Sequence, residues 1–99
     1  MWDLLIGSAS ETDIAETALW YENQKKGLGL EFITEIEAVF EKLQEDPERF
    51  RIFYSARQVR RILTSRFPCH VYYHLEGRIV RIFAVVHASR HEREWKERL

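Results

Sequence analysis

The stretch RFPCHVYYHLEGRIVRIFAVVHASR, from Arg66 to Arg90, decides the fold because it has the pattern of a β-hairpin. Two runs rich in aromatic and β-branched residues, 69–75 and 78–87, flank the dipeptide Glu76-Gly77. A two-residue loop that ends in Gly between such runs is a strong hairpin signal. The sequence therefore predicts two antiparallel strands joined by a turn at Glu76-Gly77.

This turn fixes which residues lie opposite one another, from Leu75 facing Arg78 to Cys69 facing Ala84. Side chains alternate between the two faces of a strand. One predicted face is almost wholly apolar and should pack on the core: Cys69, Val71, Tyr73, Val80, Ile82, Ala84 and Val86. The other mixes basic, aromatic and apolar groups: His70, Tyr72, His74, Arg81, Phe83, Val85 and His87. We expect this second face to be partly open and to carry the function.

Two helices are predicted ahead of the hairpin. A short apolar run at 2–6 suggests a first or edge strand, and Ser8 or Ser10 could cap a helix that ends at Gly27. A second helix is expected from about 30 to 45, before Asp46-Pro47 stops it. Its apolar stripe has helical spacing: Phe32, Ile36, Val39 and Leu43, widened by Ile33 and Phe40. Together the two helices should form an αα-hairpin.

The remaining segments complete a single domain over residues 1–99. Residues 48–56 are expected to form a loop with a short extended piece, and 59–64 a strand. The charged segment 88–99 should be a short C-terminal helix or a frayed tail, with Trp95 as its anchor. This order predicts an α+β fold: an N-terminal strand, a helical hairpin on one face of a twisted antiparallel β-sheet, and a short C-terminal helix.

Composition restricts the class of protein. The 99 residues carry a net charge of −1, with 45% hydrophobic content, enough for one core. A single cysteine, no signal peptide and no long apolar run predict a cytoplasmic protein without membrane contact. The charge is unevenly divided: residues 1–48 hold 12 acidic and 3 basic side chains, and 49–99 hold 4 and 12. The excess of basic residues in 49–99 suggests an acidic or polyanionic partner for that half. The alternative is that the acidic and basic halves simply attract each other within the fold.

Candidate chemistry comes from the second face of the hairpin. Metal-free RNA cleavage needs a base, cations for the phosphorane and an acid. These could come from His87, Arg60, Arg61, Arg81, Tyr72 and Arg90. The alternative is that the same face only binds a partner chain or is solvated.

Metal and thiol chemistry are not expected. His70 and His74 would lie about 13 Å apart along a strand, too far to share one ion. Cys69 lies on the predicted core face, where a cysteine is more often a small hydrophobic residue than a nucleophile. We therefore expect no metal and no other cofactor.

Several motifs together resemble those of one family. They are Asp13-Ile14, Trp20-Tyr21-Glu22, Gly27-Leu28-Gly29 with Phe32, Pro47, Phe50, Arg66-Phe67-Pro68 with Val71 and Tyr73, Ala84-Val85-Val86-His87, Arg90 and Trp95. In this order they resemble the RelE/ParE superfamily of toxins from bacterial type II toxin–antitoxin modules, often called plasmid stabilisation proteins. Two positions depart from the pattern: Cys69, where an aromatic residue is usual, and His91-Glu92, where Pro is common.

The resemblance implies a helical hairpin on an antiparallel sheet, a cognate antitoxin as partner, and growth inhibition when the toxin is unpaired. ParE-like members poison DNA gyrase by binding, and RelE-like members cut mRNA on the ribosome. The chain has no lysine between Lys42 and Lys96, so it lacks the catalytic lysines of RelE. YoeB- and HigB-like relatives use Arg and His instead, positions that Arg60 or Arg61 and His87 could match.

Three hypotheses follow from these observations. The first is a gyrase inhibitor that acts by binding, the second a ribosome-dependent endoribonuclease, and the third an inactive module that binds an antitoxin.

Overall fold

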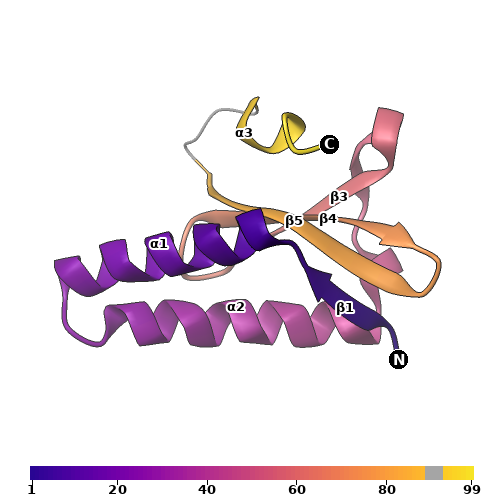
Figure 1. Ribbon diagram of the computed structural model, residues 1–99. Helices are drawn as coiled ribbons and strands as arrows, with labels where there is room; N and C mark the ends of the chain where they lie inside the picture. The colour runs from indigo at the N-terminus through magenta and orange to yellow at the C-terminus, as the bar shows by residue number, and fades with distance from the viewer. Residues whose placement is uncertain (89–92) are drawn as a thin grey trace.

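The computed structural model describes residues 1–88 and 93–99, and for Arg93 and Glu94 the backbone only. Two long helices lie side by side beneath a twisted sheet, and a short C-terminal helix lies on the other side of the sheet (Figure 1). The elements in chain order are β1 (Asp3–Ile6), α1 (Ser8–Gln24), α2 (Leu28–Glu45), the 3₁₀ turn η1 (Pro47–Arg49), β2 (Ile52–Tyr54), the 3₁₀ turn η2 (Ser55–Arg57), β3 (Val59–Leu63), β4 (Cys69–Glu76), β5 (Ile79–His87) and α3 (Arg93–Lys96).

The predicted α+β class is confirmed, with a sheet of five described strands in the order β1-β5-β4-β3-β2. Four of them form an antiparallel layer, as expected. β1 differs, because it pairs parallel to β5, with Leu4 opposite Val80 and Ile6 opposite Ile82. Since α1 follows β1 directly, this parallel pair places the start of α1 beside the middle of β5.

The predicted hairpin exists, but its register was wrong. The turn is Gly77-Arg78, and Glu76 pairs with Ile79. Gly77 has a φ of 60°, the conformation that a type II′ turn requires at its first central position and that glycine adopts without strain. The turn dipeptide is therefore one residue later than the Glu76-Gly77 pair that we predicted.

A β-bulge changes the faces further along β5. Tyr73 pairs with Ile82 and Tyr72 with Ala84, so Phe83 is the extra residue. Phe83 and Ala84 both belong to the apolar cluster on the side of the sheet away from α1 and α2. Beyond the bulge the alternation is reversed, so the predicted faces of Ala84, Val85, Val86 and His87 were wrong, and Val85 packs in the core under the helices.

The helical hairpin covers one face of the sheet, as predicted. The stripe of α2 is buried: Phe32, Ile36, Val39 and Leu43. Gly27 has the expected left-handed conformation, with a φ of 89°. Gly29 lets the helices approach closely, because a Cβ there would lie 2.6 Å from the carbonyl oxygen of Ala18. The serine caps were wrong: α1 begins after Gly7, and no side chain caps it.

The face of the sheet away from α1 and α2, which we call the reverse face, is less exposed than predicted. Trp95, in α3, is 1% exposed, and its ring stacks on Tyr72 with centroids 4.9 Å apart. A second apolar cluster forms here: Val59, Tyr72, Phe83, Ala84, Val86 and Trp95. The burial of one large aromatic side chain is worth several kcal/mol, on the order of 3–5 by truncation to Ala, which explains how so short a helix stays on the sheet.

Candidate functional site

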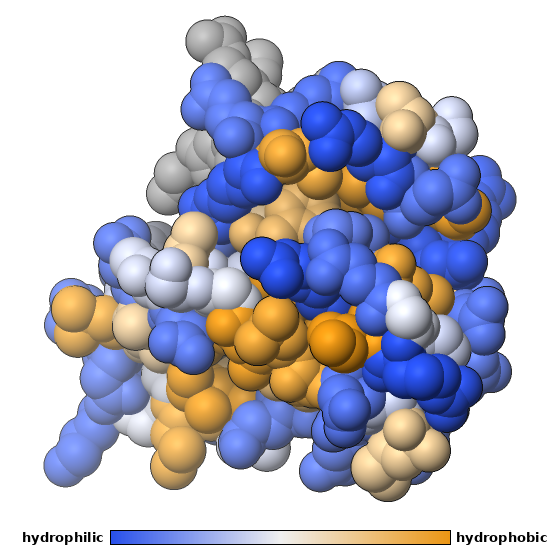
Figure 2. Space-filling view, turned by 45° about the vertical axis from the view of Figure 1, so that its right-hand side comes forward, coloured by the Kyte–Doolittle hydropathy of each residue, from blue (hydrophilic) through white to orange (hydrophobic). Residues whose placement is uncertain are grey.

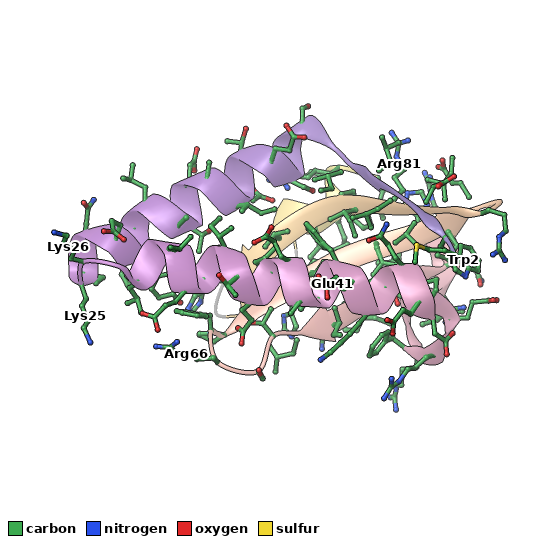
Figure 3. The ribbon with its side chains drawn as sticks, turned by 90° about the horizontal axis from the view of Figure 1, so that it is seen from below. Trp2, Lys25, Lys26, Glu41, Arg66 and Arg81 are labelled. Carbon is green, nitrogen blue, oxygen red and sulfur yellow. The ribbon has the colours of Figure 1, made fainter. Side chains whose placement is uncertain are left out.

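A depression lies where the reverse face of the sheet meets the start of α1. It has a volume of about 660 Å³ and is lined by three arginines and one histidine from separate elements: Arg57 of η2, His74 of β4, Arg81 of β5 and Arg98 after α3. Gly7, Ser8 and Ala9 form one wall, and Phe83 and Leu99 add apolar surface, whereas Ile82 is fully buried. We call this the cationic depression. Figure 3 places Arg81 at the end of the molecule opposite Lys25 and Lys26.

The arginines of the cationic depression are unequally neutralised. Glu76, the one acidic side chain among the lining residues, lies 3.7 Å from Arg81 and 3.9 Å from His74. Both distances exceed those of good hydrogen bonds. Arg57 has no acidic partner among residues 1–88 and 95–99. The depression therefore keeps an excess of positive charge.

The environment of His74 reflects this field. Burial lowers the pKa of His74 below its usual 6.5, Glu76 acts to raise it, and Arg81 and Arg57 lower it again. The imidazole is therefore mainly neutral at pH 7, because a lowered pKa favours the uncharged form.

Arg98 is held in place by Asp13 of α1. Its guanidinium forms a bidentate pair with the Asp13 carboxylate, with Nη2 2.9 Å from Oδ1, and Nη1 also donates to the carbonyl oxygen of Phe83 at 3.2 Å. Asp13 Oδ2 accepts a further bond from the backbone N–H of Val85 at 2.9 Å. These contacts satisfy backbone groups around the bulge and tie the C-terminal segment to α1.

The start of α1 adds a partial positive charge. An α-helix leaves its first N–H groups without intrahelical acceptors, and its N-terminus carries about half an elementary charge. Gly7 is the N-cap residue and offers no side chain to these groups. Because Gly7, Ser8 and Ala9 line the cationic depression, this end of the helix reinforces the arginine field.

The structure separates most of the candidate residues predicted from the sequence. Of the five candidates within the described residues, Arg81 alone lines the depression. His87 is six residues away along β5, about 20 Å for an extended strand. Tyr72 is 5% exposed and lies beneath Trp95.

The other three candidates are also elsewhere. Arg60 is on the face of Tyr73 and donates to the carbonyl oxygens of Glu48 and Phe50. The guanidinium of Arg61 lies 3.7 Å from the ring centroid of Phe53, a cation–π contact. Arg90 lies outside the described residues. The candidates thus do not form one catalytic group among the residues that the structure describes.

Sequence reasoning missed Arg57 and Arg98, and it placed His74 on the functional face of the hairpin without including it among the candidate catalytic residues. The excess of basic residues after Glu48 was the available signal, but it did not select these positions. What the assembled residues can do is bind an oxyanion: guanidinium groups donate paired hydrogen bonds to carboxylate or phosphate, and His74 can donate one more.

The described residues also lack two kinds of feature. Residues 1–88 and 93–99 contain no group of three or more His, Cys, Asp or Glu that could hold a metal ion. Within the same residues, no helix has the length and apolar character needed to cross a membrane.

Comparison with known proteins identifies the family. No curated protein matches the sequence. A solved structure titled "Chromosomal ParDE TA system from P. aeruginosa" matches with a TM-score of 0.80 and 16% identity, over 90% of this chain and 98% of that one, which shows a shared fold. The sequence model described as "ParE toxin of type II toxin-antitoxin system, parDE" matches residues 5–92. That match spans nearly the whole chain, and the chain therefore belongs to the ParE toxin family of type II toxin–antitoxin systems.

Proposed function

We propose that this chain is the toxin of a type II toxin–antitoxin pair and that it inhibits DNA gyrase by binding, without hydrolytic chemistry. A protein antitoxin holds it inactive until the pair is broken. The family match over residues 5–92 is the observation that carries this proposal. We also propose a cytoplasmic location, in keeping with a single cysteine, Cys69, that is a buried free thiol.

The dispersal of the candidate catalytic residues supports binding over hydrolysis. General acid–base catalysis needs a base within hydrogen-bond reach of the reacting group. His87 and Arg81 lie at opposite ends of β5, and Arg60 is engaged by backbone carbonyl oxygens. An inhibitor that only binds needs no such convergence.

The partner that restrains the toxin should cover a large surface. An antitoxin segment that orders on binding loses conformational entropy, so it needs extensive apolar and charged contacts to offset that loss. The ParDE structure is titled as a toxin–antitoxin system, which supports an antitoxin as the partner here.

A second candidate function is ribosome-dependent mRNA cleavage, with His87, Arg60, Arg61, Arg81, Tyr72 and Arg90 as candidate site residues. The convergence of Arg57, His74 and Arg81 in one depression favours it, because these groups could hold a scissile phosphate. The third hypothesis, an inactive antitoxin-binding module, predicts no growth defect at all.

One experiment separates these functions. The chain is expressed from an inducible promoter, and purified chain is added to a DNA gyrase supercoiling assay while transcripts from induced cells are mapped. Gyrase inhibition with filamentation and intact transcripts supports our proposal. Rapid mRNA cleavage that His87→Ala or Arg81→Gln abolishes, while the exposed Arg51→Gln control does not, supports the nuclease and refutes the gyrase proposal.

A further inference from the structure

We propose that the cationic depression is a docking site for a carboxylate-bearing segment of a protein partner. The inference rests on the proposed function, in which that partner is the antitoxin. It names the place on the toxin and the chemistry of the segment that binds there.

The first argument is charge. Arg57, Arg81 and Arg98 come from three separate segments, and the acidic side chain among the lining residues is Glu76 alone. Arg98 is engaged by Asp13, whereas Arg81 and His74 share Glu76 at 3.7 and 3.9 Å. Arg57 is thus left without an acidic partner within residues 1–88 and 95–99, and an incoming carboxylate would supply one.

The second argument is the composition of the walls. Beside the arginines, the depression is lined by Gly7, Ser8 and Ala9 at the start of α1 and by the apolar residues Phe83 and Leu99. Backbone N–H groups and guanidinium groups bind an oxyanion, and apolar surface binds hydrocarbon. A peptide with acidic and apolar side chains offers both kinds of group within a few residues.

The third argument concerns the surroundings and favours a peptide over a nucleic acid. Glu76 lies at the depression, and Asp13 and Glu11 lie close by in the first turns of α1. Residues 1–48, which include α1, carry a net charge of −9. The phosphate backbone of a nucleic acid would extend from the depression into this negative field and be repelled. A peptide can place a carboxylate in the depression without carrying a negative charge at every residue.

Apolar surface near the depression suits a protein partner as well. Leu5 of the edge strand β1 and Ile79 of β5 are 46% and 36% exposed. Figure 2, seen from the side of β1 and the hairpin end, shows apolar residues gathered in the middle of the face, bordered by hydrophilic ones. Protein interfaces commonly combine an apolar centre with charged contacts at the rim.

The test is a titration of the purified full chain, labelled with ¹⁵N, with three probes at the same ionic strength. The probes are a blocked pentapeptide EELEE, its uncharged match QQLQQ, and hexauridylate. We expect saturable amide shifts at Ser8, Ala9 and His74 with EELEE only. We also expect EELEE to raise the pKa of His74, because an added carboxylate would join Glu76 against Arg57 and Arg81.

Variants localise the binding. Arg57→Gln and Arg81→Gln should each weaken EELEE binding by about tenfold, the effect of losing one charged contact. Arg51→Gln removes the same charge from an exposed position outside the lining residues and should leave it unchanged.

The proposal is overturned if EELEE gives no shifts, if QQLQQ binds equally well, or if Arg57→Gln and Arg81→Gln behave like Arg51→Gln. Tighter binding of hexauridylate than of EELEE would assign the depression to nucleic acid instead. Since the titration uses purified chain, its result does not depend on whether the chain inhibits growth or gyrase.

Discussion

We expect substitution of Asp13 to lower the free energy of unfolding more than substitution of most other partly exposed residues. Its carboxylate accepts from the backbone N–H of Val85 and from both terminal nitrogens of Arg98, and its side chain is only 16% exposed. Asp13→Ala removes all three contacts at once. It leaves the Val85 N–H without its acceptor and releases the C-terminal segment from α1.

The magnitude follows from these contacts. A hydrogen bond to a charged group contributes about 1.5–3 kcal/mol, and a buried donor without a partner costs about 1–3 kcal/mol. Arg98 is 27% exposed and keeps its bond to Phe83, so water offsets part of its loss. We therefore expect Asp13→Ala to lower the free energy of unfolding by about 2–3 kcal/mol. For a domain of this size that corresponds to a fall in Tm of roughly 8–24 °C.

The assay is urea unfolding followed by tryptophan fluorescence and circular dichroism. Asp13→Asn keeps one acceptor oxygen for Val85 but loses the charge, so it should retain about half of the stability difference. Glu16→Ala, an exposed acidic position on the same helix, is the control and should change stability by less than about 0.5 kcal/mol. If Asp13→Ala unfolds at the same urea concentration as Glu16→Ala, the reasoning is refuted.

Three other changes test the packing and electrostatics of the fold. Trp95→Ala should cost about 3–5 kcal/mol in the free energy of unfolding, measured in urea, because it empties the centre of the reverse-face cluster; an effect below about 1 kcal/mol would mean that α3 adds little. Gly29→Ala places a Cβ 2.6 Å from the backbone oxygen of Ala18, so the two helices must separate. We expect the free energy of unfolding to fall by about 1–3 kcal/mol in the same assay. A rise in that free energy would show that the helices are not in close contact at Gly29. Burial acts to raise the pKa of Glu35, but hydrogen bonds from Phe67 and its neighbours outweigh burial and lower the pKa below the ordinary 4.5. The resulting stability is present above pH 4.5 and is lost as the pH falls through the lowered value, so a plot of unfolding free energy against pH should be flatter in Glu35→Gln at acidic pH.

Local patterns in the sequence determined the elements and the fold class. The helical spacing of Phe32, Ile36, Val39 and Leu43 predicted the buried stripe of α2, and Gly27 predicted the connection between the two helices. These features depend on residues a few positions apart, so the chemistry that produces them is visible in the sequence. The motifs spread along the chain predicted the family in the same way, because motif order needs no coordinates.

Tertiary structure alone decided the faces and the site. The turn at Gly77-Arg78 changed which residues lie opposite one another without exchanging the faces, whereas the bulge at Phe83 exchanged the two faces of β5 beyond it. Trp95 then covered the face that the strand pattern had left open. The cationic depression joins Arg57, Arg81 and other side chains from segments far apart in the chain. Such convergence depends on how strands pair and helices pack over long separations, and no local pattern of residue types contains that information.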